Sequence, residues 1–170
     1  WKKSFCAADP SKLIRVATAR AGNVVGGGDW SNDRIVPDIV NALMANDSVE
    51  VRNPVATRPW QHVLEPIFGY MLLAQLMHDS TLEKVEEYCQ AFNFGPYLSS
   101  NKTVKDLVEL SIQIWGEGRW EDKSSSDNPH EAHRLHLQVD KAWHLLGWKP
   151  LLDFNTTIKQ LGGKYVVRAG

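Results

Sequence analysis

The chain has 170 residues, of which 43 % are hydrophobic, so it is long enough to form one domain with a real core. Its formal net charge of −1 excludes the strongly basic footprint of a nucleic-acid-binding protein. No apolar run approaches the roughly 20 residues needed to span a bilayer, so we expect no membrane partner. Cys6 and Cys89 are too few for a disulfide framework, and we expect both to be buried reduced thiols of a cytoplasmic protein.

Hydrophobic periodicity predicts strands and helices that alternate along the chain. A β-branched, apolar run predicts a buried first strand from Leu13 to Arg20. The expected elements that follow are a helix over 34–46, a strand over 48–52, a helix over 65–76, a strand over 90–94, a helix over 103–115, a strand over 134–139 and a helix over 141–146. Such alternation is typical of an α/β fold.

The last segment, residues 155–170, is expected to be a helix that is frayed or broken. Gly162 and Gly163 interrupt it. Each glycine costs about 1 kcal/mol relative to alanine in a helix interior.

The first predicted strand runs into a polar, glycine-rich stretch that ends at Trp30. Ligands of open α/β sheets bind beyond the carboxyl ends of the strands, and glycine lets the backbone approach them closely. Asn23 in this stretch offers both donors and an acceptor, so it can hold a diphosphate oxygen or a sugar hydroxyl. The alternative is an asparagine that only fixes the turn.

Two arginines are candidate anion-binding residues. Arg58 directly precedes an apolar helix, and its planar guanidinium suits bidentate recognition of a diphosphate. Arg34 lies at the start of the helix predicted to begin there, where backbone N–H groups also favour an anion, so it would contact a phosphate or the nucleotide. The alternative for Arg58 is an ordinary solvated surface arginine.

The segment His130-Glu131-Ala132-His133 is one residue short of the H-E-x-x-H zinc spacing and follows Pro129 in a polar loop. We therefore expect no metal site in this chain.

Seven motifs in the same order resemble the extended short-chain dehydrogenase/reductase superfamily, and within it the CDP-glucose 4,6-dehydratase family. They are Arg20–Trp30, Asp33–Ile39, Arg52–Pro54, Arg58–Pro66, Asn93–Pro96, Pro129–His133 and Leu145–Pro150. The resemblance implies the carboxy-terminal part of a Rossmann-type fold plus a small substrate-binding lobe. Residues 1–33 and about 55–95 would complete the sheet, and about 34–54 and 96–170 would form the lobe.

The resemblance also implies an activity and a set of binding residues. The whole enzyme would be a hydro-lyase that uses NAD to dehydrate CDP-glucose to CDP-4-keto-6-deoxyglucose. The residues expected to bind the nucleotide-sugar are Asn23, Arg34, Ile35, Arg52, Asn53, Arg58, Asn93 and His130. Arg52 and Asn53 would wrap the base and ribose. For Asn93 a turn amide, and for His130 an exposed loop histidine, are the alternatives.

Two motifs of the superfamily are absent from the sequence. There is no G-x-G-x-x-G or G-x-x-G-x-x-G spacing to hold a dinucleotide, and no tyrosine is followed four residues later by lysine. We therefore expect the carboxy-terminal half of a longer, cytoplasmic, homo-oligomeric enzyme, with no catalytic residue in this chain and no activity on its own. The alternatives are another sugar-nucleotide epimerase or dehydratase, or a noncatalytic nucleotide-sugar-binding remnant.

Overall fold

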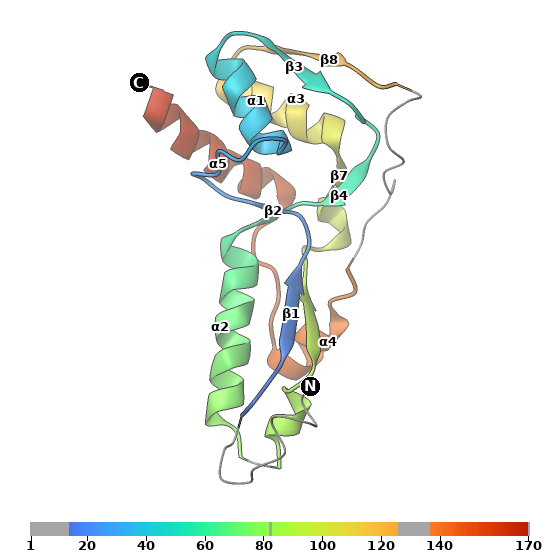
Figure 1. Cartoon of the computed structure of the whole chain (residues 1–170), viewed down its shortest axis with the longest axis vertical. Helices are drawn as coiled ribbons and strands as arrows, with labels where there is room; N and C mark the ends of the chain where they lie inside the picture. The colour runs from blue at the N-terminus through green and yellow to red at the C-terminus, as the bar shows by residue number, and fades with distance from the viewer. Residues whose placement is uncertain (1–13, 82, 126–136, 170) are drawn as a thin grey trace.

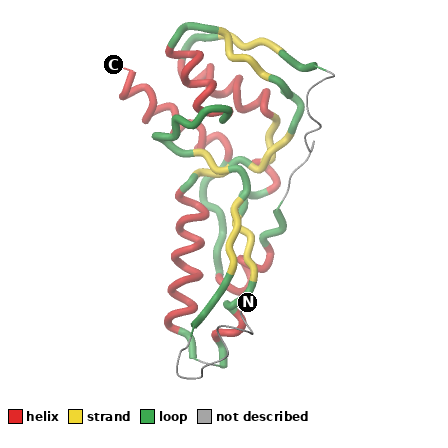
Figure 2. The backbone as a smooth tube through the Cα atoms, in the orientation of Figure 1, coloured by secondary structure: helices red, strands yellow, loops and turns green. Residues whose placement is uncertain are grey.

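The computed structural model of the chain describes residues 14–81, 83–125 and 137–169. Cys6, Leu13, His130 and His133 lie outside these residues. The molecule is elongated, and two groups of elements meet in its middle (Figures 1 and 2). None of the helices in this part of the chain combines the length and the hydropathy needed to cross a membrane.

One half of the molecule is built on a pair of parallel strands. β1 (Thr18–Ala21) pairs with β6 (Ala91–Phe94), so that Arg20 lies opposite Asn93. Two helices pack against this pair, α2 (Leu64–Asp79) and α4 (Asp140–Leu146). The ring of Phe94 meets that of Trp148 edge to face, with centroids 5.0 Å apart. This pair is the centre of the smaller core.

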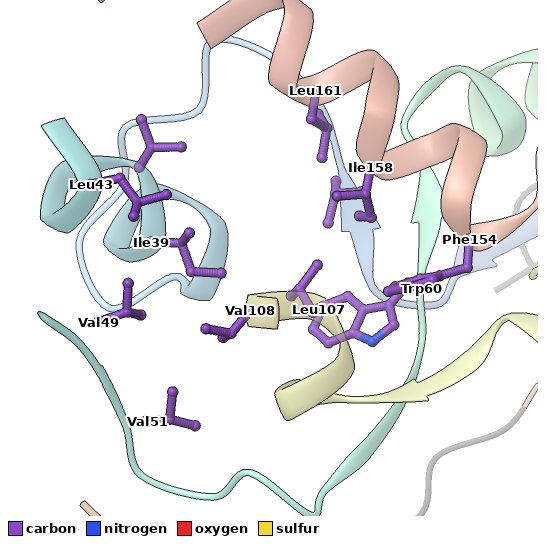
Figure 3. Packing of buried hydrophobic residues seen from close by; sticks show 12 residues of the cluster. Ile39, Leu43, Val49, Val51, Trp60, Leu107, Val108, Phe154, Ile158 and Leu161 are labelled. Carbon is purple, nitrogen blue, oxygen red and sulfur yellow. The ribbon is translucent and has the colours of Figure 1, made fainter. Parts of the chain in front are cut away.

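The other half is mainly helical (Figure 1). It contains α1 (Ile35–Met44), α3 (Val104–Trp115), α5 (Phe154–Ala169) and the parallel strands β3 (Ser48–Val51) and β8 (Arg119–Asp122). Aliphatic side chains from these elements converge on one core, which Figure 3 shows together with Trp60. Its labelled aliphatic members are Ile39, Leu43, Val49, Val51, Leu107, Val108, Ile158 and Leu161.

Short strands join the two halves. β2 (Val24–Val25) pairs in parallel with β5 (Gln61–His62), and β4 (Thr57–Pro59) pairs antiparallel with β7 (Asn101–Thr103). Two 3-10 turns, Val85–Glu87 and Leu98–Ser100, precede and follow β6.

Gln61 connects the ends of several of these segments. Its side chain is fully buried, and its amide nitrogen donates to the carbonyl of Phe94 at 3.0 Å. Its backbone N–H donates to the carbonyl of Asn23 at 3.0 Å. The carboxyl end of β6 is thereby tied to the turn that follows β1.

The predicted α/β class is confirmed, and each helix predicted over 34–46, 65–76, 103–115 and 141–146 is present within a few residues of its expected bounds. The predicted first strand was placed too early, because residues 14–17 are irregular and pairing with β6 begins at Thr18. The described part of the predicted strand 134–139 is also irregular.

The prediction of a broken last helix was wrong, because α5 runs without interruption to Ala169. Phe154, Ile158 and Leu161 on its first turns are buried in the larger core. Tertiary packing of this kind overrides a weak intrinsic propensity.

Candidate functional site

A polar cavity of about 1500 Å³ lies where the two halves meet. Its wall comes from the turn after β1, the start of α1, the strand β3 and the strand β4. Gly26, which follows β2, packs against Val63, the residue before α2. A Cβ added to Gly26 would lie 2.7 Å from Cγ1 of Val63, so only glycine permits this approach.

The cavity brings together most of the residues predicted from the sequence. Six of the eight candidates line it, namely Asn23, Arg34, Ile35, Arg52, Asn53 and Arg58. Asn93 does not line it, because its side-chain amide donates to the carbonyl of Gln138 at 3.1 Å. His130 lies outside the described residues.

The three arginines reach the cavity from three different segments. Arg58 belongs to β4, is half-buried, and donates from Nη1 to the carbonyl of Thr57 at 3.0 Å. Arg34 is the residue immediately before α1, with an extended backbone and an exposed side chain. Arg52 follows β3 and pairs with Asp33, with 3.3 Å between Nη2 and Oδ1. Cations converging from separate elements suit an anionic ligand.

Carboxylates line the same cavity and were not predicted from the sequence. Hydrogen bonds from the side chain and then the backbone of Ser31 lower the pKa of Asp29. Asp38 is exposed, but the partial loss of water around its carboxyl raises its pKa, and the nearby Asp33 raises it further. Carboxylate oxygens accept hydrogen bonds from hydroxyl groups. The cavity therefore combines groups that bind anions with groups that bind hydroxyls.

A helical period in the sequence could have identified Asp38. Arg34, Asp38 and Asn41 all line the cavity and are spaced by four and three residues, which places them on one face at the start of α1. The opposite face of α1 carries Ile39 and Leu43, which are buried in the core.

Within the described ranges, no group of three histidine, cysteine, aspartate or glutamate side chains is arranged to hold a metal ion. Cys89 is buried, as expected from the sequence.

No protein-family model matches the chain. Over 148 residues, which are 87 % of this chain, the sequence is 39 % identical to CDP-glucose 4,6-dehydratase of Salmonella typhimurium. Those residues are 40 % of that protein, so the chain spans less than half the length of the curated relative it matches.

Solved structures share the fold at low sequence identity. A dTDP-glucose 4,6-dehydratase from Bacillus anthracis, crystallised with NAD, superposes with a TM-score of 0.70 at 15 % identity, over 98 % of this chain and 47 % of that one. A UDP-glucose 4-epimerase from Thermotoga maritima with UDP-glucose gives 0.71 at 18 % identity, over 94 % and 48 %. The chain is thus a relative of CDP-glucose 4,6-dehydratase and has the Rossmann-type fold of the extended short-chain dehydrogenases/reductases, of which it covers a part.

Proposed function

We propose that this chain is the nucleotide-sugar-binding portion of an NAD-dependent CDP-glucose 4,6-dehydratase. The whole protein would dehydrate CDP-glucose to CDP-4-keto-6-deoxyglucose. The observation that carries the proposal is the convergence of Arg34, Arg52 and Arg58 with Asn23 on one polar cavity. The similarity to CDP-glucose 4,6-dehydratase supports the choice of reaction and of nucleotide.

Each cavity group has a role in this proposal. Arg58 binds the diphosphate, since a half-buried guanidinium makes stronger charged hydrogen bonds than an exposed one. Arg34 adds a second positive charge at the start of α1, where backbone N–H groups also favour an anion. Asn23 and Ile35 lie beside the phosphates and sugar, and Arg52 and Asn53 beside the base and ribose.

This grip acts on parts of the substrate that do not react. Binding these parts would hold the hexose in the position where it reacts. Less entropy would then be lost in reaching the transition state. We assign no general acid, general base or hydride step to a residue of this chain.

NAD is the cofactor proposed for the whole protein, but the described residues do not fit its diphosphate site. Dinucleotides bind at a glycine-rich turn that leads from a strand into a helix. Here β1 leads instead into the turn around Asn23 and then into the short strand β2. We therefore propose the nucleotide-sugar site for this chain and derive no redox step from its residues. We also propose that the chain is divided into the remainder of the sheet and a substrate-binding lobe.

The proposal is tested by titrating the protein, as its gene encodes it, with CDP-glucose, UDP-glucose and dTDP-glucose in a calorimeter. We expect the tightest binding for CDP-glucose, and a 4-keto product when NAD is added. Tighter binding of UDP-glucose with epimerised product would favour a sugar-nucleotide epimerase instead. Binding without any turnover would favour a noncatalytic binding protein. Absence of binding to all three would overturn the proposal.

Two further parts of the proposal concern the whole protein. We propose a cytoplasmic homo-oligomer that binds neither nucleic acid nor membranes. Light scattering of the purified protein measures its mass in solution and would contradict the proposal if only monomer were found.

A further inference from the structure

One wall of the cavity comes from the irregular end of the segment that was predicted to be a strand over 134–139. We call residues Leu137, Gln138 and Val139, which directly precede α4, the wall segment. Leu137 lines the cavity together with Gly22, Asn23 and Pro59. It therefore places an apolar side chain near Asn23, at the wall of the cavity that follows β1.

Leu137 lies next to two glycines at strand ends. A Cβ added to Gly22, the residue after β1, would lie 3.5 Å from Cδ1 of Leu137. A Cβ added to Gly95, the residue after β6, would lie 3.4 Å from Cβ of Leu137 and 3.4 Å from Cγ1 of Val139. The wall segment thus packs directly over the carboxyl ends of both strands, which is the ligand-binding edge of such a sheet.

The wall segment runs alongside β6 in the opposite direction. Lys141 lies near the start of β6, with Nζ 3.3 Å from Oε1 of Gln90 and 5.7 Å from the ring centre of Phe92. Gln138 lies farther along, where its carbonyl accepts from the side-chain amide of Asn93 at 3.1 Å. Among the described residues, this is the one side-chain hydrogen bond that joins β6 to the wall segment.

We propose that Asn93 is a positioning residue that acts on the ligand through the wall segment, and that Leu137 is the residue that contacts the ligand. The amide of Asn93 holds the backbone at Gln138, so that Leu137 lies over Gly22 and beside Asn23. Leu137 then packs against a ring face of the nucleotide-sugar and excludes water from the hydrogen bonds of Asn23. This inference rests on the proposed function, because the ligand is the nucleotide-sugar of that site.

A double-mutant cycle tests the inference in the protein as its gene encodes it, with CDP-glucose as the calorimetric probe. Asn93→Ala should weaken binding about three- to tenfold, the effect of one neutral hydrogen bond. Leu137→Ala should weaken it at least as much. The double variant should bind within about twofold of Leu137→Ala alone, because no wall remains for Asn93 to position.

Gln138→Ala is the matched control. It removes the exposed side chain of Gln138 but keeps the backbone carbonyl that accepts the hydrogen bond from Asn93. This variant should therefore bind CDP-glucose with the affinity of the parent. Thermal midpoints measured on each variant separate a loss of fold from a loss of positioning. If Asn93→Ala does not fold, Asn93→Asp keeps the shape and replaces the donor with an acceptor, and should weaken binding in the same way.

Additive losses in the cycle would show that Asn93 contacts the ligand itself and would overturn the inference. Unchanged affinity in folded Leu137→Ala would overturn it too. If the parent binds CDP-glucose and Arg58→Ala weakens that binding while Leu137→Ala does not, the wall inference alone fails. If the parent binds none of the three nucleotide-sugars, the proposed function itself fails.

Discussion

Arg52, which lines the cavity, is already engaged by a carboxylate of the same chain. Its guanidinium pairs with Asp33, and the two side chains are 73 % and 82 % exposed. An ion pair this exposed contributes little to stability, roughly 0–1 kcal/mol. If Arg52 lies beside the base or ribose as proposed, it can therefore leave Asp33 at little cost in stability.

Asp38 carries a pH dependence whose sign follows from its surroundings. The partial loss of water around its carboxyl raises its pKa, Asp33 adds to the rise and Arg52 opposes it. The folded chain therefore binds this proton more tightly than the unfolded chain. That stabilisation is complete below the ordinary pKa of 3.8 and is lost as the pH rises through the raised value.

Asp38→Asn is neutral at every pH, so it should raise the thermal midpoint above that of the parent at pH 7. The difference should shrink as the pH falls toward 4 and the parent takes up its proton. Asp153→Ala is a control of opposite sign, because hydrogen bonds from Thr156 lower the pKa of Asp153. Loss of the Asp153 carboxylate should lower the thermal midpoint at pH 7 and should lower it less in acid. A midpoint of Asp38→Asn below that of the parent at pH 7 would contradict this account.

Among the elements, α2 is held to the segment after α4 by a buried carboxylate. Oε1 of Glu65 accepts from the backbone N–H groups of Leu151 at 2.9 Å and Leu152 at 2.7 Å, and Glu65 is only 5 % exposed. Glu65→Leu leaves both donors without this acceptor, which should cost about 1–3 kcal/mol for each that stays buried. Urea denaturation measures the loss.

Glu65→Gln is the matched control for that measurement, since it keeps an acceptor oxygen of the same reach. Its free energy of unfolding should stay much closer to that of the parent. Equal losses for Glu65→Leu and Glu65→Gln would show that the two backbone hydrogen bonds are not what the carboxylate provides.

The contact between α2 and β6 depends on a glycine. A Cβ added to Gly69 would overlap the ring of Phe94 and lie 3.0 Å from Nε1 of Trp148. Gly69→Ala should therefore lower the free energy of unfolding by about 1–3 kcal/mol, although alanine is the better helix former by about 1 kcal/mol. Phe94→Leu in the same chain should recover part of the loss. A stabilised Gly69→Ala protein would show that α2 moves away freely.

Helices could be predicted from the sequence better than strands, for a physical reason. Apolar residues repeat over three turns of α1, where Ile39, Val40 and Leu43 are buried, so the period is visible. β2 and β5 have two residues each, which is too short for an alternating pattern. Their pairing comes from long-range contacts such as the bond from Gln61 to Asn23, which no local pattern encodes.

The candidate site shows the same limit at the scale of the whole molecule. Asn23, Arg34 and Arg58 were expected from their chemistry together with the family resemblance, and all three line the cavity. That Asn93 bonds to Gln138 instead of lining the cavity could not be predicted, because it depends on residues 45 positions apart. Leu137 was missed for the same reason, since only the packed fold places it over Gly22.

The molecule also exposes an apolar face on α2. Leu64, Phe68 and Met71 are 58 %, 53 % and 67 % exposed and are spaced by four and three residues along one side of the helix. Contiguous apolar surface of this kind favours association. We therefore expect the 170-residue chain expressed alone to self-associate, as light scattering would show.

Phe68→Glu with Met71→Lys should reduce that association by placing charges on the face. Neither side chain belongs to the buried core, so the loss of stability should be small. A parent chain that remains monomeric at about 100 μM and unfolds in one sharp transition would contradict the expectation.

Arg58 is proposed to bind the diphosphate of a nucleotide-sugar in the cavity, and one titration tests this directly. Arg58→Ala removes a charged hydrogen bond of about 1.5–3 kcal/mol, so calorimetry with CDP-glucose should show affinity lower by roughly ten- to hundredfold. NAD binding should change little. Arg119→Ala, which removes an exposed arginine of β8 that does not line the cavity, should bind CDP-glucose like the parent. If Arg58→Ala binds CDP-glucose as tightly as the parent does, the diphosphate does not lie at Arg58 and the account is wrong.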